Sequence, residues 1–230
     1  MSRDRPWRLA FMFDAQDGDI GQLERQLRNR RRDIQRAAGE VPVRLGIIAQ
    51  GAAESGAAEI YDFSAWRTVD GAIEIDLAAE RREAIADIAQ TVGALLKEIV
   101  EPASIEGVAG PIHAMVPARS GDVFLSLAFC RDPRTTSDEF QRWWRDQHAS
   151  VAIPILGDEL LAYDQVHADR AIGRLISAAL GAPARDYDAY DNLTWADRAA
   201  FLRSTGDADG QRLVSEDESA ESTMELADLR

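Results

Sequence analysis

The sequence predicts an α+β fold of two tandem ferredoxin-like halves, residues 1–117 and 118–230, each with an antiparallel sheet and the element order β-α-β-β-α-β. Strand-like and helix-like stretches alternate along the chain, and their order repeats after about 110 residues. The stretch 116–121, with its proline, serine and glycine, is typical of a join. Because helices on one face leave the other face of such a sheet bare, we expect the halves to close into an α+β barrel within one chain.

Each element of the first half is predicted from the spacing of its apolar residues. Strands are expected where apolar residues are continuous or alternate, and helices where they recur every three or four positions. The helix 21–38 has Leu23, Leu27 and Ile34 on one stripe, arginines on its other faces and Gly39 as a stop. The predicted elements are strands at 8–14, 41–50, 69–77 and 104–116, helices at 21–38 and 79–100, and a loop at 51–58.

The second half repeats this order. Its first helix opens on Thr136 with Glu139 three residues later, which is the pattern of a capping box. We expect this helix to end near residue 153, because Pro154 follows. The predicted elements are strands at 122–131, 159–168, 186–195 and 222–227, and helices at 136–153, 172–180 and 196–204.

Composition excludes several classes of protein. The 26 Lys and Arg residues against 40 Asp and Glu give a formal net charge of −14, which repels phosphate backbones, so we expect no nucleic-acid partner. A single cysteine, Cys130, excludes an intrachain disulfide and a cysteine-based zinc site, and the spacing of the three histidines predicts no metal site. No apolar run approaches the ~20 residues of a membrane helix, so we expect a cytoplasmic protein with no membrane partner.

The helix that opens the second half carries the first candidate residues. Phe140, Trp144 and His148 are spaced four residues apart and share one stripe of the helix. Phe140 and Trp144 are expected to pack on the sheet, which places His148 at the rim of the core. A half-buried imidazole there suits an acid or base, although a histidine that merely fills the end of the core has the same spacing.

The next two strands carry alternating polar rows. Tyr163, Gln165 and His167 project from one face of their strand. Asp188, Tyr190 and Asn192 share a face of the following strand, and we expect both rows to line one concave pocket. Asp191 would then lie with the helix-covered core, and His113 in the first half is expected to have a structural or surface role.

Three stretches of the second half, over about residues 121–230, resemble the EthD-type domain of the dimeric α+β barrel superfamily. These are the run from Arg131 to His148 with its Phe-x-x-x-Trp and final His, the Tyr-x-x-x-His of 163–167, and the strand at 187–195. The resemblance implies a small hydrophobic substrate and acid/base roles for His148 and His167. It also implies a Glu where this chain has Asn192, so the carboxylate partner of an imidazole is either missing or replaced by Asp188. The first half matches only by element order.

These observations lead to the hypothesis of a cofactor-independent acid/base enzyme of the cyclase, isomerase or dehydratase type, or a cofactor-free oxygenase, acting on a small aromatic or ketone compound. The expected catalytic residues are His148, His167 and Tyr163, and the expected substrate-binding residues are Trp144, Gln165, Asp188, Tyr190 and Asn192. Two alternatives stay open. Some two-half members of the superfamily hold haem through one histidine of the C-terminal half, and a degenerate site would leave a non-catalytic small-molecule-binding protein. A homodimer through the barrel or the helix faces is also left open.

Overall fold

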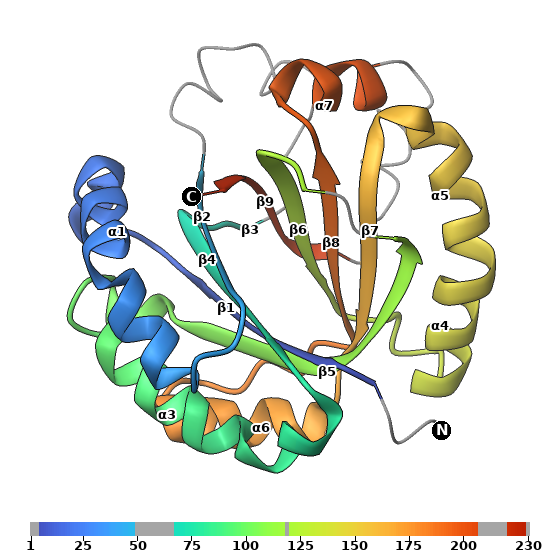
Figure 1. The fold of residues 1–230 in the computed structure, drawn as a ribbon. Coiled ribbons are helices and arrows are strands. Elements are labelled where there is room, and N and C mark those ends of the chain that lie inside the picture. Colours follow the sequence, from blue (N-terminus) through green and yellow to red (C-terminus); the bar gives the residue numbers. More distant parts are fainter. Residues whose placement is uncertain (1–4, 49–66, 118–119, 207–219, 229–230) are drawn as a thin grey trace.

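One continuous sheet runs through both halves, with helices along its outside (Figure 1). The computed structural model describes residues 5–48, 67–117, 120–206 and 220–228, so the loop expected at 51–58 lies outside the described residues. The strand order is β2-β4-β1-β5-β7-β8-β6-β9-β3. The strands are β1 (Trp7–Phe13), β2 (Val43–Ile48), β3 (Arg67–Thr68), β4 (Gly71–Leu77), β5 (Glu106–Val116), β6 (Val123–Phe129), β7 (Leu160–His167), β8 (Ala189–Trp195) and β9 (Ala220–Asp228).

The helices agree with the predicted order, with two local differences. The predicted helix 79–100 begins as a 3-10 helix and becomes α-helical only over α3. The helix that opens at Thr136 continues past Pro154, because a proline this near the C-terminal end removes a single hydrogen bond. The helices are α1 (Ile20–Ala37), α3 (Ile85–Leu96), α4 (Ser137–Trp143), a π-helical turn (Trp144–His148), α5 (Ala149–Leu156), α6 (Arg170–Leu180) and α7 (Arg198–Thr205).

The two halves share their sheet through direct strand pairing. β5 of the first half pairs antiparallel with β7 of the second, with Ile112 opposite Val166. β9 pairs with β6, and its residues 226–228 also pair with 46–48 of β2. The predicted α+β class with antiparallel strands is therefore confirmed, apart from the short parallel pair of β3 and β9. The sequence predicts one antiparallel sheet in each half, and the pairing of β5 with β7 joins the strands of both halves into a single sheet.

Three clusters of buried apolar side chains hold the fold together. The first lies between the strands of the first half and helices α1, α3 and α6. The second lies between β6, β7, β8 and helices α4, α5 and α7. The third lines the opposite face of the sheet, where Met12, Phe124 and Tyr190 are buried. Each face of the sheet therefore has its own apolar core. Because successive residues of a strand point to opposite faces, they contribute alternately to the two cores.

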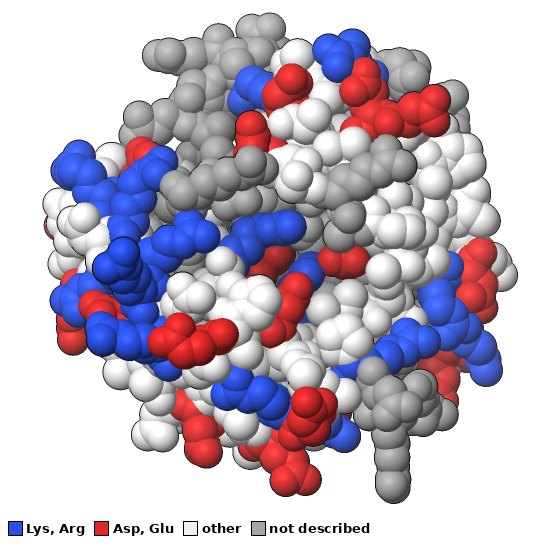
Figure 2. Space-filling model, viewed as in Figure 1, with Lys and Arg blue, Asp and Glu red and all other residues white. Residues whose placement is uncertain are grey.

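Arginine side chains gather over α1, at the left of Figure 2, on a chain whose formal net charge is −14. Several of these arginines form ion pairs with nearby carboxylates. Arg28 donates to Glu24 at 2.8 Å, and Arg30 donates to Glu98 of the chain just after α3 at 2.7 Å. These are exposed pairs, each of which contributes at most about 1 kcal/mol to stability.

Helix α6 belongs to the second half but packs on the first. Its Ile176 and Leu180 are buried in the first-half core. Two glycines make room for them. A Cβ on Gly93 of α3 would lie 2.2 Å from Leu180 Cδ2, and a Cβ on Gly107 of β5 would lie 2.4 Å from Ile176 Cγ2. The groove between α3 and β5 is thus shaped by glycine to receive α6.

A third glycine, Gly110, lies where β5 of the first half pairs with β7 of the second half, and its substitution tests how tightly the two strands pack. A Cβ on Gly110 of β5 would lie 2.1 Å from the backbone oxygen of His167, which cannot rotate away as a side chain can. We expect Gly110→Ala to lower the free energy of unfolding by about 3 kcal/mol, the upper part of the range for overpacking. Urea denaturation measures this loss. Gly173→Ala in α6 is the matched control, because nothing lies within 4 Å of the added Cβ there. Equal effects of the two substitutions would contradict the prediction.

Candidate active site

A cleft of about 970 Å³ opens where the middle of β5 and the end of β7 meet the first turn of α4. Its walls include Trp7, Pro111 and Ala168, and its polar residues include four arginines and two histidines. The volume lies within the range of small-molecule and cofactor sites. The two histidines, His113 and His167, are side chains of this cleft that could transfer a proton or bind a metal.

The His113 and His167 rings stack on each other, with centroids 4.0 Å apart and planes 28° apart. The ring of Trp144 lies 5.3 Å from the His167 ring. His167 is 6% exposed, and its Nε2 is buried with no hydrogen-bond partner among the described residues. A buried imidazole nitrogen without a partner is costly, so its retention favours a role toward a ligand.

Both rings are neutral at pH 7. Burial, followed by the charges of His113, Arg145 and Arg5, lowers the pKa of His167 to about 3, and the charge of Asp146 acts in the opposite direction. Burial, Arg5 and Arg145 lower the pKa of His113 to about 4. In addition, Arg5 Nη1 donates a hydrogen bond to His113 Nδ1. Neutral imidazoles can accept a proton or bind a metal, which imidazolium cannot do.

Tyr163 and Gln165 lie behind His167 in the helix-covered core, with no contact to the cleft. Gln165 Nε2 donates to Tyr163 Oη at 2.9 Å and to the Trp144 backbone oxygen at 3.1 Å. Tyr163 Oη donates to Asp191 Oδ2 at 3.3 Å. This buried chain of hydrogen bonds holds Trp144 against the strand that carries His167. The acid/base role predicted for Tyr163 is an untested prediction, and in this structure its hydroxyl is committed to Gln165 and Asp191.

The prediction that the two polar rows line one concave pocket is wrong. In the β7–β8 register Gln165 lies opposite Asp191, and Tyr163 opposite Leu193, so these residues share one face. Tyr190 and Asn192 have the other parity, and Tyr190 belongs to the apolar cluster on the opposite face of the sheet. Strand parity shows which residues share a face, but it does not show which face the helices cover. Gln165 and Asp191 can be buried in the helix-covered core because each forms a hydrogen bond with the Tyr163 hydroxyl.

Tyr190 and Asn192 instead surround a carboxylate supplied by the first half. Tyr190 Oη donates to Glu74 Oε1 at 2.6 Å, and Asn192 Nδ2 donates to the same oxygen at 2.7 Å. Arg44 Nη1 donates to Asn192 Oδ1 at 2.8 Å. Burial, together with the Glu74 charge, raises the pKa of Tyr190 well above its usual range. The resemblance implies a carboxylate at position 192, and Glu74 places one beside Asn192 from across the sheet.

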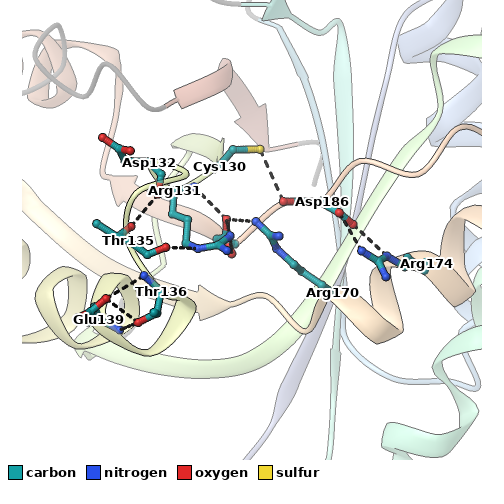
Figure 3. A network of polar contacts seen from close by, with 10 residues as sticks. Cys130, Arg131, Asp132, Thr135, Thr136, Glu139, Arg170, Arg174 and Asp186 are labelled. Atoms are coloured by element: carbon teal, nitrogen blue, oxygen red, sulfur yellow. Dashed lines mark hydrogen bonds and ion pairs between the residues drawn. The ribbon is translucent and has the colours of Figure 1, made fainter.

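Asp188 is held by two arginines, which excludes it as the carboxylate partner of an imidazole. Arg170 Nη2 and Arg131 Nη1 bind its carboxylate at 2.5 and 3.1 Å, and its side chain is buried. Figure 3 shows Arg131 and Arg170 converging between the loop after β6 and the start of α6. The neighbouring Asp186 binds Arg174 at 2.9 Å. The structure therefore gives Asp188 the role of an anchor for two loops near the cleft.

His148 does not line the cleft. It ends the π-helical turn, and its ring lies 5.6 Å from the Trp143 ring. The structure thus pairs His167 with His113, in contrast to the expected pairing of His167 with His148. His113 and Arg5 were missed because they reach the cleft only through the pairing of β5 with β7, which leaves no local pattern. Among the described residues, no group of three His, Cys, Asp or Glu side chains could hold a metal ion, and no helix is long and apolar enough to cross a membrane.

Comparison with known proteins gives a family match for part of the second half and a shared fold for the whole chain. The family model of the EthD domain matches residues 132–221. A candidate monooxygenase from Fusobacterium nucleatum has a TM-score of 0.53 at 10% identity, over 98% of this chain and 93% of that chain. A mutant chlorite dismutase from Candidatus Nitrospira defluvii has a TM-score of 0.53 at 9% identity, over 100% and 92%. A dye-decolorizing peroxidase from Bacteroides thetaiotaomicron has a TM-score of 0.51 at 10% identity, over 96% and 92%.

At these identities the solved structures establish a shared fold alone. No curated protein sequence matches the chain. One expectation is nevertheless overturned. The chlorite dismutase and the dye-decolorizing peroxidase are haem-binding proteins, so the prediction of a protein without a cofactor is wrong. The unpartnered, buried Nε2 of a neutral His167 fits the donor that haem iron requires.

Proposed function

We propose that this chain is an oxidative enzyme that modifies a small hydrophobic aromatic or ketone compound in the cleft at His113 and His167. The match of the EthD family model to residues 132–221 supports an enzyme that acts on small molecules. The fold shared with a candidate monooxygenase and a peroxidase supports an oxidative reaction, which replaces the lyase or isomerase reaction expected from the sequence. The apolar walls of the cleft support the substrate class.

The observation that carries the proposal is the unpartnered Nε2 of His167 beside a cleft large enough for a cofactor. His167 would hold the haem iron. Haem, when bound, supplies one-electron and oxygen chemistry, which amino-acid side chains do not provide.

The chain's own residues would hold and orient this site. The stacked ring of His113 and the ring of Trp144 fix the plane of the His167 ring. Trp144 is in turn held by the hydrogen bond from Gln165. His113 is neutral and half-buried, so it can exchange a proton with a bound compound.

Haem titration with matched variants tests this proposal. We expect wild type and His148→Ala to develop a Soret band and to oxidise phenols or aromatic ketones with peroxide or O₂. His167→Ala is expected to lose both the band and the activity. His148 is the appropriate control because it belongs to the same half but does not line the cleft.

Three other results would change the assignment. A band retained in His167→Ala would exclude His167 as the iron ligand. No oxidation of any compound, with or without haem, would contradict an oxidative enzyme. Binding of a compound without turnover would favour the small-molecule-binding alternative.

The remaining architectural predictions belong to the same proposal. We propose that the sheet closes into a barrel within the chain, supported by the pairing of β9 with β2, and that the halves divide at 117/118. A homodimer through a helix face is supported by Trp143 and Val151, two large apolar side chains that are about half exposed on α4 and α5, at 45% and 55%.

A further inference from the structure

The charged residues of the cleft are not evenly distributed. Its lining carboxylates Glu80, Glu83 and Asp138 are exposed to solvent. Asp169 accepts a hydrogen bond from Arg82 at 2.9 Å and caps α6. The cations whose charges act on the histidine pair are the half-buried Arg5 and Arg145. We call the part of the cleft lined by Arg5, Arg145, His113 and His167 its inner end. The other two arginines of the cleft, Arg82 and Arg170, are paired with Asp169 and Asp188.

Arg5 also fixes the chemistry of His113. A guanidinium can only donate hydrogen bonds, so His113 Nδ1, which Arg5 Nη1 contacts, must be the acceptor. A neutral imidazole that accepts at Nδ1 carries its proton on Nε2. His113 is consequently held as an N–H donor at the cleft wall, beside two guanidinium groups.

The positive charge of this end reaches both rings. Arg5 and Arg145 each lower the pKa of His113 and of His167, whereas Arg82 contributes to neither. Arg145 is paired with Asp146 at 2.7 Å, but the Asp146 carboxylate is more than half exposed and is the smallest of the influences on His167. Water screens an exposed carboxylate, so the local balance stays positive.

A ligand that complements this end has an anionic oxygen and an apolar body. We infer that the inner end of the cleft selects a small carboxylate, bound by the guanidinium groups of Arg5 and Arg145 and by the Nε2–H of His113, with its apolar part on Trp7, Pro111 and Ala168. This inference rests on the site of the proposed function and names the substrate class within it: small aromatic acids.

Benzoate and benzamide provide a direct test, because they have nearly the same shape and differ in charge. Binding of each is measured by calorimetry on haem-free protein. We expect wild type to prefer benzoate by roughly tenfold or more, as charge-assisted hydrogen bonds provide. The preference is expected to fall toward equality in Arg145→Gln and in Arg5→Gln, and to weaken as salt is added.

Arg82→Gln is the matched control. Arg82 lines the same cleft, but its guanidinium is bound to Asp169 and lies 4.6 Å from the centre of the Trp7 ring. It should keep the preference for benzoate. Equal affinity of wild type for the two compounds, no binding of benzoate, or the same loss in Arg82→Gln would overturn the inference. Because no haem and no turnover are involved, these results are independent of the oxidation assay, and either proposal can fail alone.

Discussion

Replacing Arg8 with methionine is expected to lower the free energy of unfolding by roughly 3–5 kcal/mol, because it removes a cation from the buried Glu74 and the largely buried Asp164. Arg8 is 4% exposed. Its guanidinium binds Asp76 through Nε and Nη2 at 2.7 and 3.0 Å, and Asp164 through Nη2 at 2.9 Å. Its Nη1 lies 3.8 Å from Glu74. One buried side chain of β1 thus compensates acidic groups on β4 and β7.

Urea denaturation measures this loss, and two further variants identify its cause. Arg44→Met removes a cation that also faces Glu74, at 3.5 Å, but its side chain is 30% exposed, so a loss of about 1 kcal/mol is expected. Adding Glu74→Gln to Arg8→Met removes one of the unpaired charges and should recover part of the stability. A loss below about 1 kcal/mol in Arg8→Met would mean that water reaches these carboxylates.

Acid is expected to destabilise the haem-free protein through the histidine pair. The folded-state pKa of His167 is about 3 and that of His113 about 4, both below the ordinary value of 6.5. Between these values the unfolded chain binds protons that the folded chain does not bind, so stability falls as pH falls from about 6.5 toward 3. Above pH 6.5 both states are neutral and these groups have no effect. The total loss is on the order of a few kcal/mol.

The comparison of wild type with His167→Gln isolates this contribution from that of the carboxylates. Unfolding free energies are measured by urea at a series of pH values, and the difference between the two proteins is plotted against pH. We expect the difference to change in favour of the variant as pH falls below 6.5. A difference that is independent of pH would show that His167 is protonated as easily when folded as when unfolded.

The order of elements could be predicted from the sequence because periodicity and caps are local. The capping box at Thr136 and Glu139 forms as expected, and each predicted strand overlaps a strand of the structure. The site was harder to predict, because it depends on contacts between distant segments. His113 reaches His167 only because β5 pairs with β7, and Glu74 reaches Asn192 from 118 residues away. Parity likewise grouped Tyr190 with Asn192 correctly but not with Tyr163.

The packing of α6 has a consequence for how this protein could be cut or rebuilt. A fragment that ends at residue 117 would keep the groove between Gly93 and Gly107 but lose the helix that fills it. A fragment that begins at residue 118 would carry Ile176 and Leu180 with no core to enter. We therefore expect that neither half folds on its own, and that recombination between relatives should exchange α3, β5 and α6 as one block.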